Sequence, residues 1–217
     1  MGLANYTELK AAIASLMNRS DLTASIVDFV TLAESDINSI SRLLPQETTA
    51  NITMVIAQLY NNLPTGFLDV VDFYYKYSVD GFDEQLVKMD VDKLNEIIST
   101  DTTNKTMPRA FAISDTILYD VAPDQAYVPV MRYLKAWNIA SDATNWLLTN
   151  HPGAYLYGAL VHAAPFLGGD ERIPVWKSMY QEKLDLINDL SSRVRGKTKL
   201  GFDAALIGNR HSNIRTG

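Results

Sequence analysis

Hydrophobic residues in the first part of the chain recur every three or four positions, the spacing of one face of an α-helix. A short helix is predicted between Thr7 and Asn18, and a longer one follows Asp21. Acidic residues such as Glu34 are expected off the apolar seam of this longer helix, and Pro45 is expected to end it. The seam consists of Leu22, Ile26, Phe29, Ala33, Ile37, Ile40 and Leu44.

The pattern then changes from helical spacing to alternation. Ile52, Met54 and Ile56 alternate with their neighbours in β-branched surroundings, and turn-forming residues gather at 61–66. The segment 79–90 has no clear period and is interpreted as irregular. Strands are predicted at 52–56, 67–77, 109–113, 116–121 and 127–137, and a short helix at 91–99.

Helical spacing returns near residue 141. Pro152 suits the first turn of a helix that is apolar on nearly all sides, so this helix is expected to be central and buried. A last helix begins near Asp170, and the regular pattern is lost after Gly196. Its apolar stripe is formed by Trp176, Tyr180, Leu184, Ile187, Leu190 and Val194.

This order of elements predicts an α+β fold that is mainly α. Residues 1–47 and 138–195 are expected to form one helical bundle from the two ends of the chain. Residues 48–137 are expected to form a β-rich central insertion, and residues 196–217 an extended C-terminal arm.

Composition excludes several classes of site. The chain has 217 residues, no cysteine and only three histidines, so thiol chemistry, disulfides and multi-histidine metal sites are not expected. No apolar run approaches the ~20 residues of a membrane-spanning helix. The N-terminal residues do not resemble a signal peptide, so no membrane association is predicted.

A search for catalytic motifs finds no glycine-rich nucleotide loop and no nucleophile elbow. His162 lies in an apolar helix and is interpreted as a core histidine. The acidic residues at 80–84 and 90–92 lack the alternating ligand positions and the final glutamate of an EF-hand calcium loop. We therefore expect no catalytic residue, no metal and no cofactor, with a small hydrolase as the least favoured alternative.

Charge is distributed unevenly. From Arg193 onward there are six basic residues and one acidic residue, so this tail has a charge of +5. The whole chain has a net charge of −6, so the residues before Arg193 have a charge of −11. The tail also holds more apolar residues than a purely solvated segment would. We expect it to dock on a partner through Lys197, Lys199, Leu200, Phe202, Leu206, Ile207, Arg210, Ile214 and Arg215.

An aromatic cluster occupies one predicted strand. Consecutive strand residues point to opposite faces, so Phe73, Tyr74, Tyr75 and Tyr77 make both faces aromatic. One face is expected to meet the helical bundle. The other would expose tyrosines, which are common at interfaces, so these four residues are predicted to form an intersubunit contact.

The chain resembles the head-to-tail adaptor (connector) proteins of tailed phages, particularly those of short-tailed phages. The similarity extends from Tyr6 to Val194 and rests on the order of several stretches. These stretches are 6–22, 29–38, 60–68, 108–113, 144–148, 155–160 and 165–172.

The resemblance implies a virion structural protein that is assembled in the host cytoplasm. Such adaptors form a ring, usually of twelve copies, that joins the portal to the tail (nozzle or tail-tube) proteins and lines the DNA exit channel. Their C-terminal arms typically reach onto the portal, which fits the basic, apolar tail. DNA is expected to pass without sequence-specific binding, because an acidic body repels phosphate. Another neck or tail ring component, such as a stopper, is the main alternative.

Overall fold

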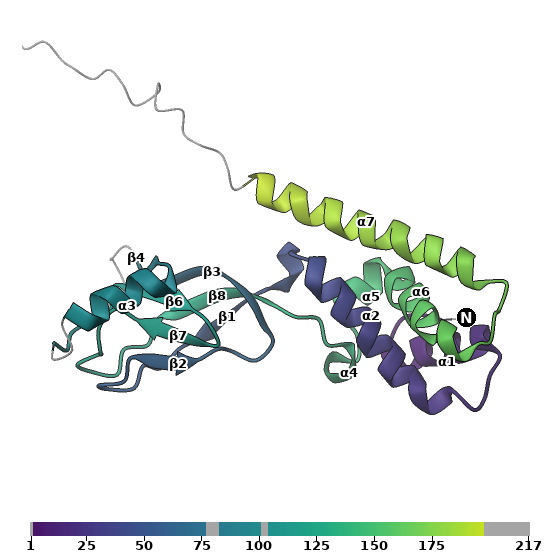
Figure 1. Cartoon of the computed structure of the whole chain (residues 1–217), viewed down its shortest axis with the longest axis horizontal. Helices are drawn as coiled ribbons and strands as arrows, with labels where there is room; N and C mark the ends of the chain where they lie inside the picture. The colour runs from purple at the N-terminus through teal and green to yellow at the C-terminus, as the bar shows by residue number, and fades with distance from the viewer. Residues whose placement is uncertain (1, 77–82, 101–103, 198–217) are drawn as a thin grey trace, which may run out of the picture.

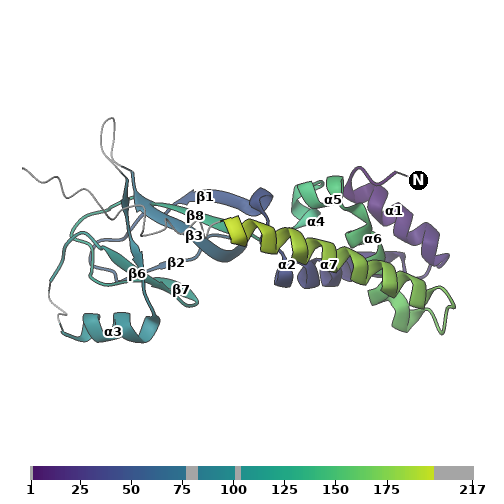
Figure 2. The same cartoon turned by 90° about the horizontal axis from the view of Figure 1, so that it is seen from above.

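A computed structural model describes residues 2–76, 83–100 and 104–197. It is elongated, with a helical part at one end and a β part at the other (Figure 1). Seen from above, the last helix lies along the helical part and reaches the junction between the two (Figure 2). The helices are α1 (Tyr6–Met17), α2 (Ile26–Ile40), α3 (Val91–Thr100), α4 (Ile139–Asp142), α5 (Trp146–Asn150), α6 (Pro152–Ala163) and α7 (Ile173–Lys197), with short 3-10 turns at Thr23–Ser25, Leu44–Gln46 and Ala164–Phe166.

Asparagine side chains start three of these helices. The Oδ1 atom of Asn5 accepts a hydrogen bond from the Glu8 amide at 3.0 Å, and Asn145 does the same for Leu148 at 2.8 Å. Asn138 caps α4 in the same way. These bonds satisfy amides that a helix start leaves free, so the polar residues fix where each helix begins.

Helix α6 is the centre of the helical part, as its sequence predicts. It packs against α1, α2, α5 and α7, and the buried positions occupy most of its circumference. Gly158 allows the close approach: a Cβ atom there would lie 2.7 Å from the Ala33 Cβ and 2.8 Å from Tyr180 Cε2. The chain ends therefore form one bundle, and the predicted α+β fold is confirmed.

Helix α2 ends earlier than its seam predicts. Its last residue is Ile40, and Ser41 is already extended. The next amide, that of Arg42, donates to the Ser191 side chain of α7 at 3.0 Å instead of continuing the helical ladder. Leu43 is buried, so the apolar seam continues to the core in a non-helical conformation. The prediction that Pro45 ends the helix was wrong by four residues.

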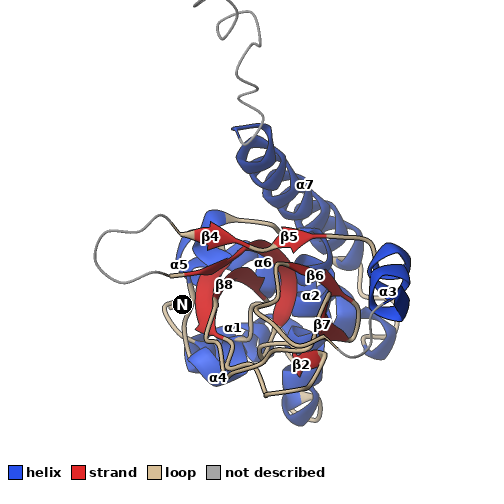
Figure 3. Ribbon diagram, turned by 90° about the vertical axis from the view of Figure 1, so that its left-hand side faces the viewer, coloured by secondary structure: helices blue, strands red, loops and turns tan. Residues whose placement is uncertain are grey.

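Two four-stranded sheets form the β part. Figure 3 views this part end-on. One sheet has the order β1-β8-β3-β4 and the other β2-β7-β6-β5; every pair is antiparallel except β5 and β6. Their buried side chains form a core separate from that of the helical part. The strands are β1 (Glu47–Asn51), β2 (Tyr60–Asn62), β3 (Phe67–Tyr75), β4 (Glu84–Gln85), β5 (Val87–Lys88), β6 (Ala110–Ile113), β7 (Thr116–Tyr119) and β8 (Val130–Lys135).

Most predicted strands are present, with one shift. Residues 47–51 form the regular strand instead of 52–56. Ile52 and Met54 still donate to the carbonyls of Pro129 and Tyr127, each at 2.9 Å, so the segment continues the pairing less regularly. The segment 79–90, interpreted as irregular, contains the two-residue strands β4 and β5. The predicted helix at 91–99 is α3, which covers β6 through the buried Leu94.

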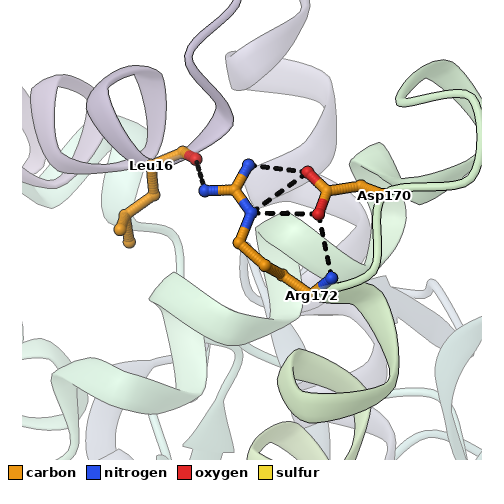
Figure 4. Close-up of polar contacts among 3 residues, drawn as sticks. All are labelled: Leu16, Asp170 and Arg172. Atoms are coloured by element: carbon orange, nitrogen blue, oxygen red, sulfur yellow. Dashed lines mark hydrogen bonds and ion pairs between the residues drawn. The ribbon is translucent and has the colours of Figure 1, made fainter.

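Arg172 ties the start of α7 to the end of α1 (Figure 4). Its Nη1 atom donates to the Leu16 carbonyl at 2.9 Å, while Nε and Nη2 bind the Asp170 carboxylate at 2.9 and 2.6 Å. The guanidinium also lies 4.8 Å from the centre of the Trp176 ring. The pKa of Asp170 is lowered to about 2, chiefly by hydrogen bonds from Arg172. A cation at a free helix carbonyl is favourable, so this pair fixes the turn that leads into α7.

Candidate assembly surfaces

The long helix α7 leads the chain out of the bundle. Trp176, Tyr180 and Ile187 face the core, and Ser191 is bonded to Arg42 at the junction. Lys197 is the last residue of α7. The other predicted arm residues lie outside the described residues: Lys199, Leu200, Phe202, Leu206, Ile207, Arg210, Ile214 and Arg215.

A second apolar stripe runs along the outer side of α7. Val175, Met179 and Leu186 are 55%, 39% and 41% exposed. At 100° per residue these three positions, together with the exposed Arg193, fall within about 40° of one another around the helix. An exposed row of large apolar side chains is typical of a contact surface. We call these four residues the α7 outer stripe.

The aromatic cluster of β3 is divided between two environments. Phe73 and Tyr75 are buried in the β core, where Phe73 packs edge-to-face on Phe111 with ring centres 5.1 Å apart. They therefore pack against the second sheet, not against the helical bundle as expected. Tyr74 lies on the outer face, paired across the sheet with Val130 and Gln85. Tyr77 lies outside the described residues. The intersubunit contact stays a prediction, and of these residues Tyr74 is on the accessible face.

Two chain segments connect the helical and β parts, and side chains of α2 bind one of them. Asn38 donates through Nδ2 to the Trp137 carbonyl at 3.1 Å and accepts from the Trp137 amide through Oδ1 at 2.9 Å. On the other connector, Gln46 accepts from the Leu43 amide at 2.9 Å and reaches the Lys135 carbonyl at 3.4 Å. These bonds fix how the two parts are oriented.

Near this junction, α2 carries a buried charged side chain. It is that of Glu34, which is 8% exposed. Its Oε1 atom accepts two hydrogen bonds, from the Tyr155 hydroxyl at 2.7 Å and from the Ile139 amide at 2.8 Å. The Tyr155 hydroxyl in turn accepts from Asn145 at 2.9 Å. This network joins α2, α4, α5 and α6 around one carboxylate.

Burial dominates the electrostatics of this network. Loss of solvation raises the pKa of Glu34, and the nearby Asp142 raises it further, while the bonds from Tyr155 and Ile139 act in the opposite direction. Burial and the charge of Glu34 also raise the pKa of Tyr155, which therefore stays a donor. The carboxylate is thus held by donors of its own chain, and no cation among the described residues neutralises it.

Glu34 also lines a groove at the junction. The groove has a volume of about 540 Å³ and runs between α2, the start of β3 and the connector at 136–140. We call it the junction groove. Its lining residues are Tyr6, Val30, Thr31, Glu34, Ser35, Asn38, Leu68, Ala136, Trp137, Asn138, Ile139 and Ala140.

Sequence analysis placed Glu34 off the apolar seam, and this expectation was wrong. Glu34 follows Val30 by one helical turn, and both side chains are buried. The signal that could have found it is this i, i+4 relation to a buried valine. Ile139 of α4 and Tyr155 of α6, which cover it, lie more than 100 residues away in the chain.

No group of three or more histidine, aspartate or glutamate side chains that could hold a metal occurs within residues 2–76, 83–100 and 104–197. His162 is half-buried, and its Nε2 atom lies 2.9 Å from Asp36 Oδ2 on α2. Asp36 also accepts from the Tyr180 hydroxyl at 3.2 Å. This histidine therefore takes part in packing α6 against α2 and α7. In the same described ranges, no helix is long and apolar enough to cross a membrane.

Comparison with known proteins gives one result. No curated protein matches the sequence at a significant level. The family model of the SU10 adaptor protein matches residues 4–199, which include the bundle, the β part and all of α7. This is a structural family of phage adaptors and not a family of enzymes. The chain therefore belongs to the SU10 adaptor protein family, a family of phage head-to-tail adaptors.

Proposed function

We propose that copies of this chain form a ring that joins the portal to the tail and lines the DNA exit channel. The observation that carries the proposal is the family match over residues 4–199, because it covers the whole described fold from α1 to α7. The proposed ring has twelve copies, as the resemblance implies, and it belongs to the virion. The proposed partners are the portal on the head side and nozzle or tail-tube proteins on the tail side.

The C-terminal arm is the proposed portal-binding segment. Helix α7 supports this assignment because it carries the chain along the bundle to the junction, where Lys197 ends it. The arm that follows combines basic residues with large apolar ones. Such a segment gains both charge pairing and apolar burial on a partner, and within a ring each copy presents its arm to that partner at high effective concentration.

Tyr74 marks the proposed intersubunit contact on the β part. Val71 and Val128 are 37% and 49% exposed on the same part, and the Asp72–Arg132 ion pair neutralises the charges between neighbouring strands. Apolar and aromatic side chains with little net charge are the composition expected at the core of an interface. The outer face of the β1-β8-β3-β4 sheet therefore supports a contact between copies.

Charge supports the proposed passage of DNA. The chain before Arg193 carries −11, so a channel lined by this body would repel phosphate. Because bound DNA would slow packaging and ejection, weak interaction with the channel wall suits the proposed role.

Size-exclusion chromatography with light scattering tests the ring and the arm. We expect the full chain to self-associate, alone or on the portal, and we expect a variant that lacks residues 199–217 to lose portal binding. This variant should stay folded, as thermal melting would show, because the buried core residues described above all precede residue 198. A strict monomer with and without the portal contradicts the ring, and unchanged portal binding by the variant contradicts the arm. Binding to a ring below the adaptor instead of to the portal identifies a stopper.

A further inference from the structure

The helical part exposes large apolar side chains in two separate places. One is the start of the α7 outer stripe, which consists of Val175 and Met179. The other is formed by Leu32 of α2 and by Phe166 in the 3-10 turn after α6, which are 49% and 54% exposed. Phe166 packs on the buried Phe29 with ring centres 5.4 Å apart, and Leu32 follows Phe29 by one turn of α2. We call Leu32 and Phe166 the α2 flank patch.

Val175 and Met179 lie on the side of α7 that faces the start of α6. At 100° per residue, Lys183 lies about 60° around α7 from the buried Tyr180. Met179 and Val175 follow in the same direction, at about 100° and 140° from Tyr180. A Cβ atom on Gly153, in the first turn of α6, would lie 3.5 Å from Lys183 Cε, so this direction leads to α6. Seen from above, α1, α4 and α5 lie on this side of α7 (Figure 2).

Helix α2 borders the opposite side of α7. Ser191 lies about 20° around α7 from Tyr180, in the direction away from Lys183. Its hydroxyl accepts a hydrogen bond at 3.0 Å from the amide of Arg42, which follows the end of α2.

The order of contacts around α2 places Leu32 beyond α7. Ala33 faces α6, because a Cβ atom on Gly158 would lie 2.7 Å from its Cβ. Asp36 lies about 60° from Ala33 around α2 and accepts from the Tyr180 hydroxyl of α7 at 3.2 Å. Leu32 lies about 40° further in the same direction. The α2 flank patch and the start of the α7 outer stripe are therefore on opposite sides of α7.

The two surfaces also lie at the same level along the molecule. The Tyr180 hydroxyl is 3.3 Å from the carbonyl oxygen of Ala33, and Leu32 is the preceding residue of α2. Met179 precedes Tyr180 directly, and Val175 lies about 6 Å before Met179 along α7. Leu32 is therefore level with this segment of α7 to within about one helical turn, or about 5 Å.

Two different surfaces at one level, on opposite sides of a chain, are what a closed ring requires. A head-to-tail contact repeated by rotation closes into a ring. When the long axis of each copy follows the channel, rotation about the channel brings opposite sides of neighbouring copies together and shifts neither copy along it. Both surfaces are apolar, so their contact removes apolar area from water.

We infer that Val175 and Met179 of one copy pack against Leu32 and Phe166 of the next copy in the ring. This inference rests on the proposed ring and names the contact that closes it through the helical parts. The occupant of each surface is thus a second copy of this chain. The arm beyond α7 stays available for the portal.

Cysteine crosslinking tests this contact directly, because the parent chain has no cysteine. The single variants Leu32→Cys and Met179→Cys are mixed before assembly, with the portal present if it is needed, and the rings are mildly oxidised. We expect covalent dimers from the mixture and few from either variant alone, because a head-to-tail contact joins different residues. The matched control replaces Met179→Cys by Gln181→Cys, since Gln181 is exposed but lies about 160° around α7 from Met179. The control mixture should remain largely uncrosslinked.

An added charge provides the second measurement. Met179→Glu places a carboxylate in the apolar contact and should weaken self-association at least tenfold, as the concentration dependence of light scattering would show. Gln181→Glu adds the same charge and should have little effect. Thermal melting of both variants below the assembly concentration should match the parent, because both positions are exposed.

The outcomes separate this contact from the proposed function. Rings whose cysteine mixture gives no more dimers than the control overturn the inference and leave the proposed function standing. Equal crosslinking of either single variant alone would show a two-fold contact and also overturn it, as would a crosslink to the portal instead of a second copy. Absence of any ring contradicts the proposed function itself.

Discussion

Asn38 and Trp137 are joined by two hydrogen bonds although 99 residues separate them. The Asn38 amide donates to the Trp137 carbonyl and accepts from the Trp137 amide, at 3.1 and 2.9 Å. One side chain of α2 therefore satisfies both backbone groups of a residue in the connector. This is the pairing that a neighbouring strand would otherwise supply, and it holds the connector against the bundle.

Replacement of Asn38 should loosen the junction. Asn38→Ala leaves the Trp137 amide and carbonyl without these partners in a half-buried site, so we expect a loss of about 1–3 kcal/mol in the free energy of unfolding. Urea denaturation followed by tryptophan fluorescence measures this loss. The exposed Asn188 of α7 provides the control, and Asn188→Ala should change stability by less than about 0.5 kcal/mol. Equal effects of the two substitutions would contradict the role of Asn38.

Glu34 should make stability depend on pH in a defined direction. Its pKa is raised in the folded chain by burial, so below the ordinary value of 4.5 it is protonated in both states. As the pH rises above 4.5, the unfolded chain loses its proton first, and the folded state becomes less stable until the folded pKa is passed. Glu34→Gln removes this ionisation, so the variant should gain stability relative to the parent as the pH rises through that window.

Thermal denaturation at a series of pH values measures this difference. Glu171→Gln, at an exposed position, is the matched control and should track the parent throughout. A difference between Glu34→Gln and the parent that is the same at every pH would show that the folded state does not raise the pKa of Glu34.

Gly158 should tolerate no side chain. In Gly158→Ala the new methyl group would lie 2.7 Å from the Ala33 Cβ and 2.8 Å from a ring carbon of Tyr180, so α2 and α7 must move apart. We expect a net loss of about 1–3 kcal/mol from overpacking, despite the better helix propensity of alanine. Gly153→Ala is the control in the same helix, because its Cβ would have an ordinary distance of 3.4 Å to Tyr157. It should be neutral or slightly stabilising, as circular dichroism melting would show.

Alanine substitutions of the adjacent residues Phe73 and Tyr74 should have different effects on stability and self-association. Phe73 is 2% exposed in the β core, so Phe73→Ala should cost about 3–5 kcal/mol of stability. Tyr74 lies on the outer face, so Tyr74→Ala should leave the stability of the monomer nearly unchanged and weaken self-association. Denaturation and light scattering separate the two effects. Unchanged self-association of Tyr74→Ala would remove this residue from the proposed interface.

Local sequence signals predict the helices and most strands of this chain. The repeat of apolar residues locates α1, α6 and α7, and Pro152 marks the start of α6, because both signals act within a few residues. The end of α2 was misjudged because a distant residue decides it: Ser191 binds the Arg42 amide. A local pattern contains no information about such a partner.

The candidate surfaces were less predictable than the fold. Glu34 becomes buried because Tyr155 and Ile139 cover it, and neither is near it in the sequence. The α7 outer stripe was hidden by the stronger core stripe that contains Trp176 and Tyr180. In the β3 cluster, alternation correctly separates the two faces, but it does not say that the second sheet, and not the bundle, covers Phe73.

The pairing of β1 with β8 has a consequence for how this family can vary. Glu47 and Leu134 are opposite each other at the base of the β part, so the chain enters and leaves it through two adjacent antiparallel strands. The segment between these two strands can be replaced as a unit, because its two ends are only about 5 Å apart. Insertions, deletions or complete replacement there would leave the course of the chain through the helices unchanged, so the β part of such a protein can diverge while the helical part is kept.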